Sequence, residues 1–123
     1  MSWNDPPPRN LPHEWTQGER RKQLSEFAAL CAGIANGFAD HDPLAAAEFH
    51  ERAARAEALL AGGWSQSELN LLAGQFPMGA WWLHPKALDY DAPREPWQEE
   101  IAVKHARAKI VARDLRSVAT YDA

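Results

Sequence analysis

The chain is poor in cysteine, since Cys31 is the only one among its 123 residues. A single thiol excludes a disulfide within the chain and any zinc site that one chain builds from several cysteines. The sequence also lacks an apolar run long enough to cross a bilayer, and its first residues do not have the charged and then apolar order of a signal peptide. We therefore expect a cytoplasmic protein that does not associate with membranes.

Motifs for catalysis and metal binding are lacking too. There is no glycine-rich phosphate loop, no nucleophile elbow and no cysteine with an evident histidine partner. No two of the five histidines stand four residues apart, which excludes the usual two-histidine metal site on one helix. We predict no catalytic residue, no metal and no cofactor. A small enzyme stays open as an alternative, with acid–base groups in the 84–95 connection that contains His84, Asp89, Asp91 and Glu95.

What the sequence does contain is a helical pattern. Its 46% hydrophobic and 24% charged residues are typical of a globular protein. Apolar residues recur every three or four positions in several stretches, which predicts an all-α fold. We expect an irregular bundle of about four helices, with a long aromatic and proline-rich connection before the last. The expected organisation is an extended proline-rich arm over 1–15 and one helical domain over 16–123, with helices near 16–39, 43–61, 66–74 and 96–119.

Local signals mark the ends and faces of these helices. Asp42 before Pro43 is a capping residue followed by a first-turn proline, and Ser65 with Glu68 forms a capping box. Gly33 and Gly37 lie four residues apart, and we expect them to permit the close approach of another helix. The first helix has one apolar stripe, and its cysteine is expected to be a buried, unreactive side chain: Leu24, Phe27, Cys31, Ile34 and Phe38.

Two groups of charged residues are expected on the surface. The run from Glu19 to Lys22 is interpreted as solvated first turns of the first helix. In the second helix, Arg52 follows Glu48 and Arg55 follows Glu51 at the four-residue spacing of exposed ion pairs.

The tryptophans give the clearest functional signal. All six lie at or near expected element ends or in connections, and Trp81 and Trp82 are adjacent in a segment broken by proline and glycine. Trp and Met are favoured anchors of protein interfaces. We therefore predict an aromatic surface for a partner, made of Phe76, Met78, Trp81, Trp82, Trp97 and Trp3. The alternative is that this segment folds back and covers the helices, with one indole in the core and the other in the interface as a mixed case.

Charge distribution supports a second alternative. The chain carries a net charge of −4, which disfavours binding of nucleic acid over the whole surface, but the span 101–119 alone is +4. The helix, glycine turn and Ser-capped helix over 58–70 are similar in layout to a DNA-reading motif, although the second helix has no Lys or Arg. A DNA-associated regulator would use the basic face of the last helix: Lys104, Arg107, Lys109, Arg113 and Arg116. A solvated face is the simpler interpretation of the same residues.

These observations favour a small non-enzymatic protein-interaction or regulatory protein. We expect a homodimer or a subunit of a complex that contacts its partners through the aromatic connection. Nucleic acid is the less favoured partner.

Overall fold

The computed structural model describes residues 12–74, 76 and 95–121. Over these residues the chain is an all-α bundle of four helices, as the sequence predicts, with one short two-stranded ribbon. The elements in chain order are β1 (Pro12–Glu14), α1 (Gln17–Phe38), α2 (Pro43–Gly62), α3 (Gln66–Ala73), α4 (Pro96–Arg116) and β2 (Ala119–Tyr121).

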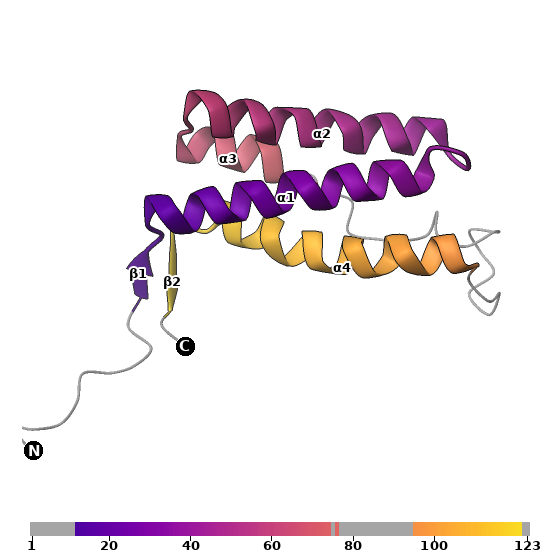
Figure 1. Cartoon of the computed structure of the whole chain (residues 1–123). Helices are drawn as coiled ribbons and strands as arrows, with labels where there is room; N and C mark the ends of the chain where they lie inside the picture. The colour runs from indigo at the N-terminus through magenta and orange to yellow at the C-terminus, as the bar shows by residue number, and fades with distance from the viewer. Residues whose placement is uncertain (1–11, 75, 77–94, 122–123) are drawn as a thin grey trace, which may run out of the picture.

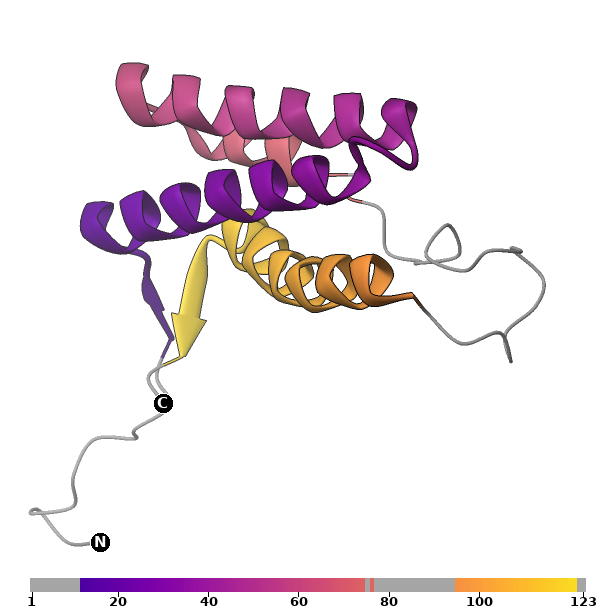
Figure 2. The same cartoon turned by 45° about the vertical axis from the view of Figure 1, so that its right-hand side comes forward.

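The long helix α1 lies in the middle of the bundle. It packs along α2 on one side and along α4 on the other, while the short α3 lies against the C-terminal part of α4 (Figure 1). Seen after a 45° turn, α2 and α4 still lie on opposite sides of α1 (Figure 2), and the ribbon of β1 and β2 projects from the body. Much of the surface of α4 that faces away from α1 is therefore left on the outside.

The predicted helix starts are confirmed. The Asp42 carboxylate accepts from the Ala45 backbone N–H at 3.1 Å, and the Ser65–Glu68 capping box is formed in full. Gly63 caps the C-terminus of α2, and its φ of 91° suits glycine because a side chain makes that region unfavourable.

The two chain ends differ from the expectation. Helix α4 stops at Arg116 rather than near 119, and residues 119–121 pair antiparallel with residues 12–14 of the expected arm. In this register His13 is opposite Thr120. The β-branched and aromatic residues at positions 118, 120 and 121 favour extended backbone, and pairing with β1 supplies hydrogen-bond partners that a frayed last helical turn lacks.

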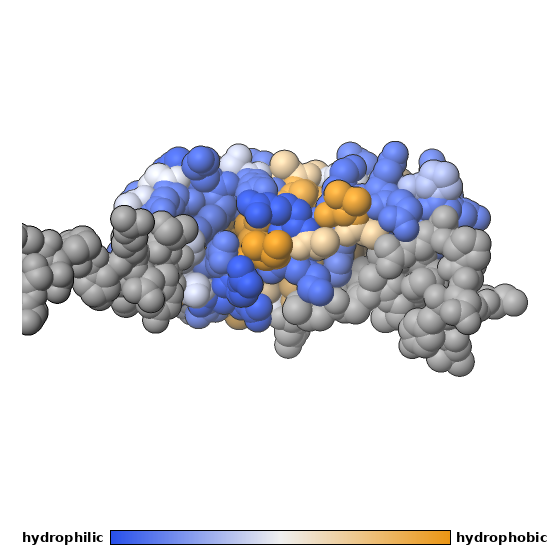
Figure 3. Space-filling model, turned by 90° about the horizontal axis from the view of Figure 1, so that it is seen from below, coloured by the Kyte–Doolittle hydropathy of each residue, from blue (hydrophilic) through white to orange (hydrophobic). Residues whose placement is uncertain are grey.

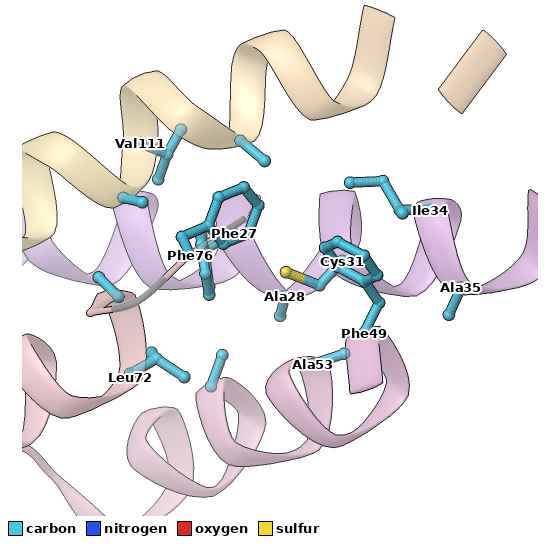
Figure 4. Close-up of a cluster of buried hydrophobic side chains, with 14 of the residues drawn as sticks. Phe27, Ala28, Cys31, Ile34, Ala35, Phe49, Ala53, Leu72, Phe76 and Val111 are labelled. Atoms are coloured by element: carbon cyan, nitrogen blue, oxygen red, sulfur yellow. The ribbon is translucent and has the colours of Figure 1, made fainter. Parts of the chain in front are cut away.

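The core is built on the predicted stripe of α1, whose five residues are fully buried. Figure 4 shows Phe27, Phe49 and Phe76 pointing into the space between the helices. The ring centroid of Phe76 lies 5.7 Å from that of Phe27 and 5.8 Å from that of Phe49. Burial raises the pKa of the Cys31 thiol to about 12, which keeps it protonated and unreactive at neutral pH.

Gly33 and Gly37 of α1 allow α4 to approach closely, as predicted. A Cβ built on Gly37 would lie 2.7 Å from Cγ1 of Ile101, which is closer than a real Cβ approaches a neighbouring heavy atom. A Cβ on Gly33 would meet the side chain of Lys104 at 3.2 Å. The packing of α4 on α1 therefore requires glycine at position 37, whereas Gly33 faces only the flexible side chain of Lys104.

Two arginines expected on the surface are buried instead. Arg20 donates from Nη1 to the carbonyl oxygen of Asp114 at 2.8 Å and from Nη2 to that of Ser117 at 2.5 Å. Arg52 donates to the carbonyls of Leu72 and Gly74 at 2.8 and 3.2 Å. Each guanidinium therefore lies at the C-terminal end of another helix, where unpaired carbonyls and the helix dipole favour a cation.

Candidate interaction surface

Of the residues predicted to form the aromatic surface, the structure describes Phe76 and Trp97. Phe76 is 4% exposed, and its ring also stacks on that of His105 with centroids 5.3 Å apart. It is a core side chain that offers no surface to a partner. Met78, Trp81, Trp82 and Trp3 lie outside the described residues.

Trp97 is half-buried at the start of α4. Its ring stacks on that of His41 with centroids 3.8 Å apart and planes 2° from parallel, and it meets Phe38 edge-on at 6.3 Å. Its indole N–H donates to the Glu95 carboxylate at 2.5 Å. Trp97 thus holds the first turn of α4 against the connection between α1 and α2. Its role in partner binding stays a prediction, which concerns the exposed part of its ring.

Two of the basic residues of α4 lie on the side that faces α1. Arg107 donates from Nε and Nη2 to the two carboxylate oxygens of Glu26, at 2.6 and 2.9 Å. This paired contact lowers the pKa of Glu26 and raises that of Arg107. The stem of Lys104 lies over Gly33. Arg107 is therefore already engaged within the molecule and is a weaker candidate for an external anion.

The other three cations lie toward the opposite flank of α4. Arg113 has a loose contact with Asp114, with 3.7 Å between Nε and Oδ1. Lys109 and Arg116 have no carboxylate within ion-pair distance among the residues that the structure describes. Together with Ala106 and Ile110, these three side chains line a shallow depression of about 300 Å³.

Between the two flanks runs a line of apolar side chains that the sequence analysis did not single out. Val103 is 69% exposed, Ile110 is 41% exposed, and Ala106 between them is exposed as well. Figure 3, which views the molecule from the α4 side, shows apolar side chains gathered at the centre with hydrophilic ones around them. We call the outward residues Glu99, Val103, Ala106, Ile110 and Arg113 the α4 outer face.

A signal for this face was present in the sequence. Its members are spaced by four, three, four and three residues, which places them on one side of a helix. The core stripe of the same helix is stronger, with Ile101, Ala108, Val111 and Leu115 buried. The shorter and weaker outer stripe is therefore harder to recognise in the sequence than the core stripe.

Charge is distributed unevenly along α4. Glu99 and Glu100 lie in its first turns, and Glu95 precedes them, whereas the second half carries Lys109, Arg113 and Arg116. Acids at the N-terminus and bases at the C-terminus of a helix both complement its dipole. The result is a helix that is acidic at one end, apolar at the centre of its outer face and basic at the other end.

One residue of the motif that is similar in layout to a DNA-reading motif is held by internal contacts. Gln66, which begins α3, donates from Nε2 to the Leu115 carbonyl and to Asn70, both at 2.9 Å, and accepts from Arg20 at 2.7 Å. A side chain used in this way is not available to a base edge without breaking the contact between α3 and α4. Use of the basic face of α4 by nucleic acid is not tested by these contacts and stays a prediction.

Chemistry-bearing groups are sparse in the part of the chain that the structure describes. No three His, Cys, Asp or Glu side chains gather there in a way that suits a metal ion. None of the helices in that part is both long and apolar enough to span a membrane. Of the groups proposed for acid–base catalysis, His84, Asp89 and Asp91 lie outside it, whereas the Glu95 carboxylate accepts a hydrogen bond from the Trp97 indole N–H.

Comparisons of the chain with protein-family models, with curated proteins and with solved structures find no match.

Proposed function

We propose that this chain is a small non-enzymatic protein-interaction protein, acting as a homodimer or as a subunit of a complex, and that its contact surface includes the α4 outer face. The observation that supports this proposal is the exposed line of Val103, Ala106 and Ile110, flanked by Lys109 and Arg116. An apolar centre with a polar and charged rim is the usual make-up of a protein interface.

A protein partner fits this surface better than nucleic acid does. Phosphate groups gain nothing from the Val103 and Ile110 side chains, and Arg107 is already bound to Glu26. The net charge of −4 also disfavours a polyanion. The runner-up, a DNA-associated regulator, predicts strongly salt-dependent binding to duplex DNA; a lack of binding at low salt removes it.

The aromatic connection remains part of the proposal. Met78, Trp81, Trp82 and Trp3 are of the residue types that dominate interface energies, and Trp97 contributes an indole at the start of α4. Their support comes from composition and not from contacts, so the α4 outer face is the surface to test first.

The test is a double substitution, Val103→Ser with Ile110→Ser. We expect the variant to keep its helix content, because both side chains point away from the core, and to lose self-association or a partner that co-purifies with the wild type. Leu71→Ser on α3 is the matched control, because Leu71 is also 69% exposed but lies on another helix. The proposal fails if the double variant keeps every association of the wild type, as judged by light scattering and by co-purification.

A further inference from the structure

We infer that the occupant of the α4 outer face is a second copy of this chain, whose α4 packs antiparallel to the first about a twofold axis at Ala106. This inference rests on the proposed function, since it names the partner for the same surface.

The spacing of the outer face is self-complementary. Val103 lies three residues before Ala106 and Ile110 four residues after it, while Glu99 and Arg113 lie seven residues to either side. A twofold axis places residues before the centre in one copy beside residues after the centre in the other. Val103 then lies near Ile110 of the second copy, and Glu99 lies near its Arg113.

The charges select the antiparallel arrangement. In an antiparallel pair, the acidic start of each α4 meets the basic end of the other, which carries Lys109, Arg113 and Arg116. A parallel pair would place acid on acid and base on base. The helix dipoles add to this preference, because antiparallel dipoles attract.

The same charges argue against a uniformly acidic partner. Such a partner would be attracted to the second half of α4 and repelled by Glu95, Glu99 and Glu100 in the first half. Only a surface that is basic at one end and acidic at the other satisfies both halves. The chain itself presents a surface of this kind.

The centre of the face suits a helix pair. Ala106 is small, so two helix axes can come close there, with Val103 and Ile110 filling the space on either side. The contact involves one face of a single 21-residue helix, so its area falls at the low end of protein interfaces. We therefore expect a dimer that dissociates on dilution through the micromolar range.

Charge reversal tests the arrangement directly. Arg113→Glu sets Glu99 beside a second acid in the dimer, and Glu99→Arg sets Arg113 beside a second base, so each variant alone should become monomeric. An equimolar mixture should associate again, because both contacts are then between opposite charges. The measurement is sedimentation velocity or light scattering over a concentration series, with circular dichroism to confirm that each variant is folded.

A cross-link tests the position of the axis. Ala106→Cys should form a disulfide-linked dimer under mild oxidation, since the two copies of position 106 face one another, and buried Cys31 does not compete. Ala47→Cys, an exposed position on α2, is the matched control and should give little cross-linked dimer.

The results separate this inference from the proposed function. A wild-type protein that is monomeric throughout the concentration series overturns the inference, as does a dimer that neither charge reversal weakens. If the wild type is monomeric but co-purifies with a partner that is lost when Val103 and Ile110 are replaced, the proposed function stands. The α4 outer face then binds a different protein and not a second copy of the chain. Rescue in the mixture together with a cross-link at 106 and not at 47 supports the antiparallel pair.

Discussion

Ile101 on α4 occupies the space that a side chain on Gly37 of α1 would need. The gap between a Cβ at position 37 and Cγ1 of Ile101 would be 2.7 Å, and Ile101 is itself buried and branched. Neither partner can move away cheaply, because both lie at the contact between the two longest helices. Position 33 differs, since the side chain opposite it is the stem of exposed Lys104.

Alanine at these two positions should therefore have opposite effects. Gly37→Ala gains about 1 kcal/mol of helix propensity, but overpacking of a core costs roughly 1–3 kcal/mol, so we expect a net loss of stability of up to about 2 kcal/mol. Gly33→Ala should stabilise the protein by most of this gain in helix propensity, because the Lys104 side chain can shift to make room for the added methyl group. Urea unfolding of both variants measures the difference. A stabilised Gly37→Ala variant would contradict the close packing of α1 on α4.

The buried guanidinium of Arg20 should be essential for joining the helix ends. Replacing Arg20 by Met removes its hydrogen bonds to the Asp114 and Ser117 carbonyls and to the Gln66 amide oxygen. Each hydrogen bond to a charged group contributes about 1.5–3 kcal/mol, so we expect a loss of at least about 3 kcal/mol in the free energy of unfolding. Arg20→Lys should not restore this stability, because a single ammonium group cannot reproduce the several hydrogen bonds of the planar guanidinium.

Arg21 provides the control for this experiment. It is exposed, and its guanidinium lies 5.4 Å from the ring centroid of Trp64. Exposed contacts of this type contribute about 0.5–1 kcal/mol, so Arg21→Met should change the urea midpoint only slightly. Equal effects at positions 20 and 21 would show that Arg20 does not join α1 to the C-terminal end of α4.

The two buried arginines also show where sequence reasoning reaches its limit. The capping residues Asp42 and Ser65 were predicted correctly because their hydrogen bonds reach only three residues along the chain. The acceptors of Arg20 lie 94 and 97 residues away, on an element whose position depends on the whole fold. From the sequence alone, a run of charged residues at a helix start is interpreted as exposed to solvent. Only the position of α4 in the folded chain shows that Arg20 is buried.

The candidate surface was predicted only in part, for a similar reason. The basic residues of α4 were recognised, but the sequence does not reveal that Arg107 reaches Glu26, 81 residues away, while Lys109 and Arg116 have no ion pair among the described residues. Phe76 was expected at a surface and is in the core. Its burial depends on where α3 ends relative to α2, which a hydrophobic residue in a proline-rich segment does not indicate.

The Glu26–Arg107 pair should add stability only above the pH at which Glu26 ionises. Its pKa is lowered in the folded protein by the hydrogen bonds from Arg107, so the contribution is present above the unfolded value and is lost as the pH falls through the folded value. Glu26→Gln should therefore cause a small loss of stability at pH 7, and this loss should shrink as the pH falls below the unfolded value of 4.5. Added salt should reduce the difference at pH 7, because both side chains are partly exposed.

The Cys31 thiol should make stability fall with rising pH in the alkaline range. Its pKa is raised from 9.0 to about 12 by burial, so between these values the unfolded chain loses a proton that the folded protein keeps. The unfolded state then binds fewer protons, and the free energy of unfolding decreases as the pH rises, by at most about 1.4 kcal/mol per pH unit from this group. Comparison with Cys31→Ala isolates this slope from the titration of lysines and tyrosines. The same burial predicts that a thiol reagent at pH 8 labels the native protein slowly and the urea-unfolded protein at once. Fast labelling of the native protein would mean that the core around Cys31 opens readily.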